Sequence, residues 1–452
     1  MSHRRKDVET IRSAQARLAS GATTSFRLAE EAIERATDAD GQGRLVFTRL
    51  FAEQAKSMAE AADRFLEAGV ELSAIAGLPI SIKDLFDVRN QATTAGSAVL
   101  REAEPAAADA CVVARLKRAG AVIVGKTNMT EFAYSGVGIN PHFGTPANPH
   151  DRANRLIPGG SSSGAAVSVT DGMALAAIGS DTGGSARIPA ALCGVTGFKP
   201  TQRRIPLEGV FPLSTSLDSV GTIARTVECC ALVDAVLAAE PRDETKALSP
   251  RGLTLTVPRN YVFDGLDAHV AKTFEAALGR LSEAGATITE EHFPEFEEIA
   301  QLNSQGGLTA PEAFAFHRRS GANFSGYDPL VLERILAGQS ITAAEYVDLR
   351  EARSRMIVRF QAAHSNAPWI VCPTVPIAAP PIDRLKNDAD EFRRVNRLLL
   401  RNPSLVNFLD GCALSIPCQG PGEAPVGLML MGWTGTDRAL LSAGLAIEMV
   451  LH

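Results

Sequence analysis

The chain has 452 residues, of which 45% are hydrophobic and 21% charged, and its formal net charge is −6. This composition provides enough apolar side chains for a large core, which excludes a disordered or fibrous protein. The negative charge and an aromatic content of only 6% also exclude a general surface for nucleic acids or anionic membranes.

Cysteine usage and the N-terminal sequence indicate a reducing compartment. The seven cysteines are odd in number and irregularly spaced, with no CxxC pair, and none of the eight histidines belongs to an HExxH motif. We therefore expect free thiols and no metal site. The N-terminal MSHRRKDVET lacks a following apolar stretch, and no run of 18 apolar residues occurs, so we expect no secretory signal, no membrane span and a cytoplasmic location.

Helices and strands are predicted to alternate along the chain. Apolar residues recur every three or four positions in the first 70 residues, and further on helical patterns are followed by short apolar runs. The pattern predicts helices at about 26–37, 50–68, 107–119 and 437–450, strands at about 121–125 and 425–432, and a helix followed by a β-rich segment within 272–290. This alternation is typical of an α/β fold, and we expect a large mixed β-sheet core flanked by helices on both faces.

The sequence LPISIKD at 78–84 predicts a strand with period-two alternation. Its apolar side chains fall on one face, whereas Ser81 and Lys83 fall on the other. A lysine at such a position is ordinarily a surface residue whose stem covers apolar neighbours. If buried instead, its neutral amine would be favoured and could act as a base.

No linker or internal repeat divides the chain, so we expect a single domain over residues 1–452. Its expected parts are N-terminal helices at 1–70, a catalytic core at 71–230, a variable insertion at about 240–360 and a C-terminal core at 361–452. Residues 296–350 have the least regular pattern and look like an insertion on the core.

The Gly- and Ser-rich segment 157–201 has three interpretations. A flexible linker is disfavoured because helix-compatible and strand-like runs alternate with the Gly/Ser turns. Residues 160–164 match G-x-S-x-G, which would make Ser162 the nucleophile of an α/β-hydrolase elbow. That elbow must follow a strand, but the preceding DRANRLIPGG is polar and contains Pro158, and no later histidine has a distinctive context.

The third interpretation makes Ser185 a nucleophile in GSDTGGSARIP. Two glycines let successive backbone N–H groups converge before an apparent helix start, where they could stabilise an oxyanion. Because no histidine is near in sequence, the distant Lys83 is the candidate base.

Several segments together resemble the amidase signature family, serine hydrolases with a Ser–Ser–Lys triad. The resemblance covers almost the whole chain and is strongest from residue 75 to 226. The matching motifs are LPISIKD with Lys83, GKTNMTEFA at 125–133, PGGSSSG at 158–164, GSDTGGSARIPAALCG at 179–194, GFKPT at 197–201, and, more weakly, SLDSVGTIART at 216–226, CPTVP at 372–376 and PVGLMLMG at 425–432.

The resemblance implies roles for individual residues. Ser185 matches the nucleophile, Ser161 the bridging serine on a cis peptide bond, and Lys83 the base. The turn that forms the oxyanion hole matches Thr182, Gly183, Gly184 and Ser185. Arg187 and Asp181 are expected to hold this loop in place.

Two positions depart from the family pattern. Ala186 stands where a larger aliphatic residue is usual, and the run SSSGAAVS stands where many members have SSGGS. Neither departure affects a triad position, but both could alter packing around the oxyanion hole.

The resemblance implies an amidohydrolase that cleaves a C–N bond of a small carboxamide, urea-like or carbamate substrate through an acyl-enzyme on Ser185, releasing ammonia or an amine. No metal or cofactor is expected, and the expected partner is a small amide rather than nucleic acid or membrane, with a homodimer left open. Parts of 125–145, 300–345 and 370–410, with Met129 among them, are expected to line the substrate pocket. The run at 403–413 is similar to members that act on small amides and urea derivatives.

Two alternatives remain open at this point. One is the amidase subunit of a tRNA-dependent amidotransferase, which would need partner chains. The other is a non-catalytic binding protein on the same fold, whose mark would be the loss of a triad position; all three positions are present.

Overall fold

A computed structural model describes residues 9–70, 72–240, 245–321 and 323–452. Residues 1–8, which make up most of the N-terminal segment expected not to be a secretory signal, lie outside the described residues. Among the helices of these ranges, none combines the length and the apolarity that crossing a membrane requires.

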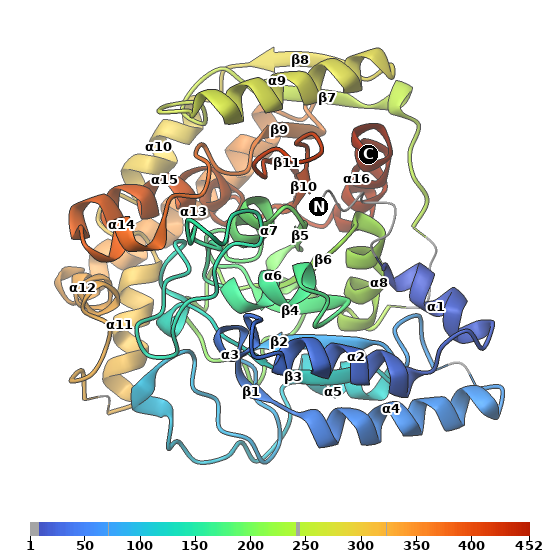
Figure 1. The fold of residues 1–452 in the computed structure, drawn as a ribbon. Helices are drawn as coiled ribbons and strands as arrows, with labels where there is room; N and C mark the ends of the chain where they lie inside the picture. Colours follow the sequence, from blue (N-terminus) through green and yellow to red (C-terminus); the bar gives the residue numbers. More distant parts are fainter. Residues whose placement is uncertain (1–8, 71, 241–244, 322) are drawn as a thin grey trace.

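The core of the described chain is an eleven-stranded mixed sheet (Figure 1). The strand order is β1-β3-β2-β4-β6-β5-β10-β11-β9-β7-β8. Strand β2 runs parallel to its neighbours β3 and β4, and β7 runs parallel to its neighbours β8 and β9, whereas the remaining pairs are antiparallel. The strands are β1 Phe47–Leu50, β2 Pro79–Lys83, β3 Val122–Thr127, β4 Ala176–Ser180, β5 Thr196–Lys199, β6 Val220–Ala224, β7 Thr254–Pro258, β8 Thr287–Glu291, β9 Trp369–Pro373, β10 Cys412–Pro417 and β11 Gly427–Gly432.

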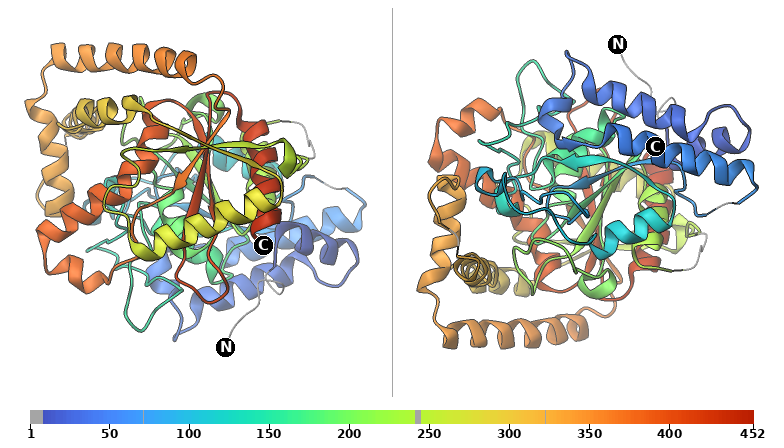
Figure 2. Two further views of the ribbon diagram at one scale, coloured as in Figure 1. Left: turned by 90° about the horizontal axis from the view of Figure 1, so that it is seen from above. Right: turned by 90° about the horizontal axis from the view of Figure 1, so that it is seen from below.

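Helices cover both faces of this sheet, which confirms the predicted fold class (Figure 2). The α-helices are α1 Ile11–Ala19, α2 Ser25–Thr37, α3 Gly43–Val46, α4 Ala52–Glu67, α5 Cys111–Arg118, α6 Ser163–Thr170, α7 Arg187–Cys193, α8 Val227–Leu237, α9 Ala268–Glu283, α10 Pro294–Leu302, α11 Thr309–Arg319, α12 Pro329–Ala337, α13 Ala343–Ala363, α14 Ile382–Lys386, α15 Ala389–Phe408 and α16 Asp437–Leu451. The predicted helices at 26–37, 50–68, 107–119 and 437–450 and strands at 121–125 and 425–432 are confirmed within a few residues.

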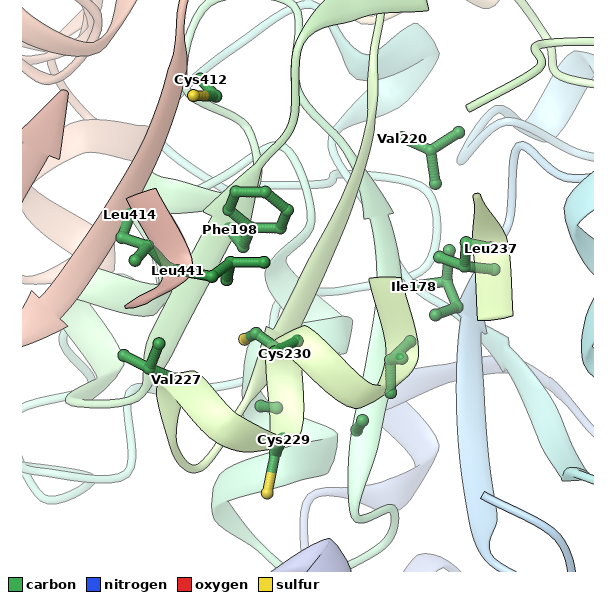
Figure 3. Close-up of a cluster of buried hydrophobic side chains, with 14 of the residues drawn as sticks. Ile178, Phe198, Val220, Val227, Cys229, Cys230, Leu237, Cys412, Leu414 and Leu441 are labelled. Atoms are coloured by element: carbon green, nitrogen blue, oxygen red, sulfur yellow. The ribbon is translucent and has the colours of Figure 1, made fainter. Parts of the chain in front are cut away.

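Alternate residues of each central strand pack into different cores. In β4, Ile178 belongs to the core formed with α5, α8 and α16, whereas Ala177 belongs to the core formed with α2, α4 and α6. Figure 3 shows part of the first of these cores, where Cys230 of α8 lies nearer to Phe198 of β5 than Cys229 does. The period of two along a strand therefore produces two hydrophobic layers, one on each side of the sheet.

Strand β2 is buried on both faces, so the surface interpretation of Lys83 is wrong. Ile80 and Ile82 pack into the core on one side, as predicted. On the other side, Ser81 Oγ lies 2.8 Å from Ser168 Oγ of α6, and Lys83 itself is fully buried. The polar face of the strand is covered by a helix rather than by solvent.

The segment 296–350, whose sequence pattern is the least regular, is largely helical. It contains most of α10, all of α11 and α12, and the start of α13, which lie together as an outer layer beside the sheet (Figures 1 and 2). These helices give a weak sequence signal because they bury little: of the 21 residues of α13, only Met356 and Phe360 are buried. Strands β7 and β8, within the expected insertion at 240–360, extend the same sheet to its edge.

Candidate active site

Lys83 ends strand β2 in a fully buried position and contacts two serines. Its Nζ lies 2.7 Å from Ser161 Oγ and 2.8 Å from Ser180 Oγ, the last residue of the neighbouring parallel strand β4. Burial lowers the pKa of Lys83 from 10.5 to about 7, although the charges of Asp181 and Asp218 act in the opposite direction. A large fraction of this lysine is therefore a neutral amine near neutral pH, as a base requires.

Ser161 lies at the start of the loop that leads into α6. The peptide bond between Gly160 and Ser161 is cis, which agrees with the geometry that the family resemblance implies. The carbonyl of Ser161 accepts a hydrogen bond from the N–H of Thr130 at 3.0 Å. Its hydroxyl thus faces Lys83 while its backbone is held by the segment after β3.

Ser162, the nucleophile of the elbow interpretation, points into the interior. Its Oγ donates to the carbonyl of Ser180 at 3.4 Å, its side chain is fully buried, and it does not line the main cavity. A serine without access to a substrate cannot attack it, so the elbow interpretation is wrong.

Ser185, in contrast, opens onto a cavity of about 810 Å³. Thr182 and Gly183 line the same cavity, whereas Lys83 and Ser161 lie behind this wall, buried in the protein. The N–H of Ser162 donates to the carbonyl of Ser185 at 3.2 Å, which ties the two serine-bearing loops together. Ser185 therefore lies on the cavity side, and the Lys83–Ser161 pair on the interior side, of one wall.

Asp181 organises the turn that carries Ser185. Its carboxylate accepts hydrogen bonds from the N–H groups of Gly184 at 2.8 Å and Ala186 at 3.2 Å. The Gly184 N–H is consequently engaged by Asp181, although Gly184 was among the residues expected to form the oxyanion hole. The N–H groups of Thr182, Gly183 and Ser185 remain as candidate donors.

Asp181 is held in turn by Arg187, as the sequence analysis expected. Arg187 Nη2 lies 2.8 Å from Oδ1 and Nε lies 3.0 Å from Oδ2, and both side chains are fully buried. Asn407 of α15 completes the network by accepting from Arg187 and donating to Asp181. Although burial alone would raise it, the ion pair with Arg187 lowers the pKa of Asp181 to about 2, so the carboxylate stays charged and the loop stays fixed.

Thr182 is anchored by a second acid. Its Oγ1 donates to Asp218 Oδ1 at 2.6 Å, and Asp218 also accepts the N–H groups of Leu213 and Ser214. Burial raises the pKa of Asp218 to about 6, although these hydrogen bonds oppose the shift. The turn is thus fixed at one end by Asp218 and at the other by Asp181.

Substituting Gly184 tests whether the backbone conformation of this turn tolerates a side chain. Its φ is +126°, and an added Cβ would lie 2.6 Å from Pro403 Cβ and 2.7 Å from Ile188 Cδ1. We expect Gly184→Ala to reduce the free energy of unfolding by about 1–3 kcal/mol and to lower kcat at least tenfold, because a strained, displaced turn misplaces Ser185. Denaturant unfolding and steady-state kinetics measure both effects.

The neighbouring glycine is the matched control for stability. A Cβ at Gly183 would meet Leu400 Cδ2 at 3.6 Å, an ordinary contact, so Gly183→Ala should change the free energy of unfolding by less than about 0.5 kcal/mol. Equal stability of the two variants would show that the turn tolerates a side chain at Gly184.

The cavity is lined by the three segments expected from the sequence and by residues that were not expected. Ala133, Tyr134 and Ser135 come from 125–145, and further lining residues come from α10 to α12 and from α15. Tyr261 and Leu213 were not expected there. Met129 is a correction: it is fully buried in a hydrophobic core and lies outside this cavity, with its carbonyl bound to Asn140.

Three further residues of the site were not found from the sequence: Ser180, Asp218 and Asn407. Ser180 lies in GSDTGGS, but its contact with Lys83 depends on β2 and β4 being parallel neighbours. Asp218 occurs in the SLDSVGT motif, which by itself assigns no role to the carboxylate. Asn407 reaches the site from a helix more than 200 positions away in the chain.

Comparisons with known proteins agree on the kind of molecule this site resembles. The family model described as Amidase matches residues 27–441. The chain is 36% identical over 403 residues to 2-amino-5-chloromuconic acid deaminase of Comamonas testosteroni, covering 88% of this chain and 87% of that protein. It is 34% identical over 478 residues to a Glutamyl-tRNA(Gln) amidotransferase subunit of Roseiflexus sp. (strain RS-1), covering 98% of this chain and 96% of that protein. A solved structure described as a crystal structure of amidase superposes with a TM-score of 0.87 at 31% identity, covering 98% of this chain and all of that one.

Proposed function

Because the chain belongs to the amidase family, we propose that it is a serine amidohydrolase that cleaves a C–N bond of a small carboxamide, urea-like or carbamate substrate. The observation that carries the proposal is the buried contact between Lys83 and Ser161, with the lysine pKa lowered to about 7, in a loop whose next residue, Ser162, donates to the carbonyl of the cavity-lining Ser185. A buried lysine in this state has no evident structural purpose, because it pairs with hydroxyls rather than with a carboxylate.

The proposed reaction begins with two proton transfers along the three side chains. The neutral amine of Lys83 keeps its contact with Ser180 and accepts the hydroxyl proton of Ser161. Ser161 takes the proton of Ser185 as the Ser185 Oγ attacks the amide carbonyl. In this proposal the candidate N–H donors of Thr182, Gly183 and Ser185 stabilise the negative charge that develops on the carbonyl oxygen.

Collapse of this intermediate releases the amine. Lys83 returns its proton through Ser161 to the leaving nitrogen, the C–N bond breaks, and ammonia or an amine departs. A water molecule then attacks the acyl-enzyme with the same groups acting as base and acid, which frees the acid product and restores Ser185.

Labelling by a fluorophosphonate tests the proposed nucleophile. We expect a single covalent adduct on Ser185, found by mass spectrometry of the digested protein, together with release of ammonia or amine from members of an amide, urea and carbamate panel. Ser162→Ala should label as the unaltered protein does, because Ser162 is buried away from the cavity. An adduct on Ser162, or none at all, would contradict the proposal, and a missing adduct would favour the non-catalytic alternative.

Ser161→Ala should impair the hydrolysis of amides far more than the hydrolysis of activated esters. If Ser161 relays the proton to the leaving nitrogen, its loss should lower kcat/KM for a carboxamide by about 10³- to 10⁴-fold. The loss for the matching p-nitrophenyl ester should be at least tenfold smaller, because nitrophenolate departs without a proton. Ser162→Ala is the control, being a neighbouring buried hydroxyl outside the proposed relay. Equal losses on the amide and the ester would contradict the relay.

The amidotransferase alternative is supported by similarity over almost the whole chain and opposed by the cavity. Glutamine, as the ammonia donor, carries an α-carboxylate that arginines attract, but it also carries an α-ammonium group. None of the described residues that line the cavity is Asp or Glu, so the lining offers no acidic partner for that ammonium. Ammonia release from glutamine that appears only when partner subunits are added would favour the alternative.

A further inference from the structure

The cavity in front of Ser185 is strongly basic. Four arginines line it, namely Arg334, Arg394, Arg397 and Arg401, and no acidic residue is among its described lining residues. The remaining wall consists of apolar and neutral polar side chains. A concave site with one sign of charge concentrates ligands of the opposite sign.

Three of these arginines form a line along helix α15. Arg394, Arg397 and Arg401 are spaced three and four positions apart, which places them on one face of the helix. The same face touches the oxyanion turn, since a Cβ at Gly183 would lie 3.6 Å from Leu400 and 3.9 Å from Ser404. With a rise of about 1.5 Å per residue, Arg401 starts about 5 Å and Arg397 about 10 Å along the axis from Ser404.

Arg394 is the member of this line that already forms an ion pair with a carboxylate. It lies 2.6 Å from Glu391 and forms a two-pronged contact with that carboxylate. Its charge is therefore largely compensated before any ligand enters, and it contributes least to the positive field of the cavity.

Arg401 is oriented by neutral groups. Its guanidinium donates to the backbone carbonyls of Val262 at 2.6 Å and of Asp264, and to the Asn402 side chain at 2.9 Å. None of the ion pairs found in the described ranges includes Arg401, and these three contacts use three of its five N–H donors. Carbonyl oxygens fix the direction of the fork without forming an ion pair, although the charge of Asp264 also acts on this guanidinium.

Arg334 and Arg397 also lack a carboxylate partner among the described residues. Arg334 of α12 lies over the ring of Tyr134, 4.4 Å from the centroid, a contact that orients a guanidinium without removing its charge. Arg397 is exposed at the cavity wall. Together with Arg401, three arginines that form no ion pair in the described ranges thus line one cavity from two helices.

We propose that this cavity binds an amide whose acyl chain carries a carboxylate, so that the enzyme acts on monoamides of small dicarboxylic acids. The inference rests on the proposed function, because it places the amide at Ser185 and the carboxylate at Arg397 and Arg401. Arginine matches a carboxylate in a bidentate manner, which gives direction as well as attraction. The positions along α15 suit a carboxylate a few bonds from the scissile carbonyl.

A phosphate is the other anion that arginine binds, and the arrangement favours the carboxylate. A phosphate is best held by groups that converge on one point, whereas Arg397 and Arg401 begin about a turn apart and Arg334 comes from another helix. Such spaced charges suit planar carboxylates along an extended carbon chain.

The test compares acid amides with neutral amides of the same shape. Succinamate is paired with 4-methylpentanamide and adipamate with 6-methylheptanamide, so that each pair differs only in carboxylate against isopropyl. We expect kcat/KM to be at least about 100-fold higher for at least one acid amide than for its neutral partner, and this ratio to fall as ionic strength rises. A ratio near one for both pairs would overturn the proposal.

Arginine variants test which residue binds the carboxylate of the substrate. Arg397→Gln should lower the acid-to-neutral ratio about 10- to 100-fold, and Arg397→Lys should restore part of it, since a charged hydrogen bond contributes on this scale. Arg393→Gln is the matched control on the same helix: Arg393 pairs with Glu333 and Asp390 outside the cavity, and its ratio should stay within about twofold. Equal ratios in the Arg393 and Arg397 variants would overturn the assignment.

A binding measurement separates this inference from the proposed chemistry. Calorimetry with the Ser185→Ala variant should show that adipate or succinate binds more tightly than inorganic phosphate, and that Arg397→Gln weakens the dicarboxylate at least tenfold. Tighter binding of phosphate would overturn carboxylate recognition. Fluorophosphonate labelling of Ser185 without dicarboxylate binding would leave the hydrolase standing and refute the substrate class, whereas dicarboxylate binding without labelling would do the reverse.

Discussion

Replacing Ser185 with alanine is expected to lower kcat by about 10⁴- to 10⁶-fold, the largest effect of any single change in this protein. The reason is that the covalent path through the acyl-enzyme is lost altogether, and what remains is the modest acceleration provided by binding and by the oxyanion donors. Single-turnover assays of amine release, with the protein in excess, measure the residual rate.

The same variant should fold normally. The side chain of Ser185 opens onto the cavity, so removing its hydroxyl leaves the core intact, and the free energy of unfolding should change by less than about 0.5 kcal/mol. A folded Ser185→Ala protein that kept more than about a hundredth of the activity would exclude Ser185 as the nucleophile.

The second large effect is expected at Lys83. Lys83→Met should lower kcat/KM by about 10³- to 10⁵-fold, because no other group that could accept a proton contacts Ser161 in the described chain. Lys83→Arg should not restore activity, since a guanidinium stays protonated at every accessible pH. Initial rates on a carboxamide check both variants, and substantial activity of Lys83→Arg would show that only a positive charge is needed at this position.

The pH profile gives an independent measure of the same base. With the pKa of Lys83 lowered to about 7, the fraction of neutral amine rises with pH, so kcat/KM should increase through pH 7 and level off above it. The free energy of unfolding should also rise with pH. Between pH 7 and 10.5 Lys83 is more fully protonated in the unfolded chain than in the folded protein, so the cost of burying it falls as the pH rises. Lys83→Met should therefore be more resistant to denaturant than the unaltered protein at pH 7, and the difference should shrink by pH 10.

The features of the site that depend on residues close together in the sequence were predictable, whereas those that depend on distant segments were not. Ser161 and Ser185 lie in short motifs where glycines and hydroxyls recur at fixed spacing, and their segments fold as the sequence indicated, with α6 and α7 beginning just after them. The contact between Lys83 and Ser180 was out of reach, because it depends on β4 lying parallel beside β2. The burial of Lys83 likewise depends on α6, which covers a strand face that its alternating pattern alone would leave to solvent.

Other features show the limits of one-dimensional patterns. The motif near Ser135 predicts Met129 in the pocket, yet an apolar side chain inside a motif is usually core. The sequence pattern between residues 296 and 350 is the least regular of the chain because the helices there bury few residues. The arginine line at 394, 397 and 401, in contrast, is visible as a helical spacing in the sequence, and only its position opposite Ser185 required the fold.

The order of the strands has a consequence for how this protein is made on the ribosome. Strand β5 lies between β6 and β10, and Gly197 pairs with Ser415, which is 218 positions later in the chain. At a synthesis rate of about 5–20 residues per second, β5 waits roughly 10–45 seconds for its second neighbour. During that interval the backbone groups on one side of β5 have no strand to pair with, and such an edge can associate with another chain. Because β10 and β11 both lie in the segment from residue 412 to the last residue, the gap beside β5 is filled only when synthesis is nearly complete.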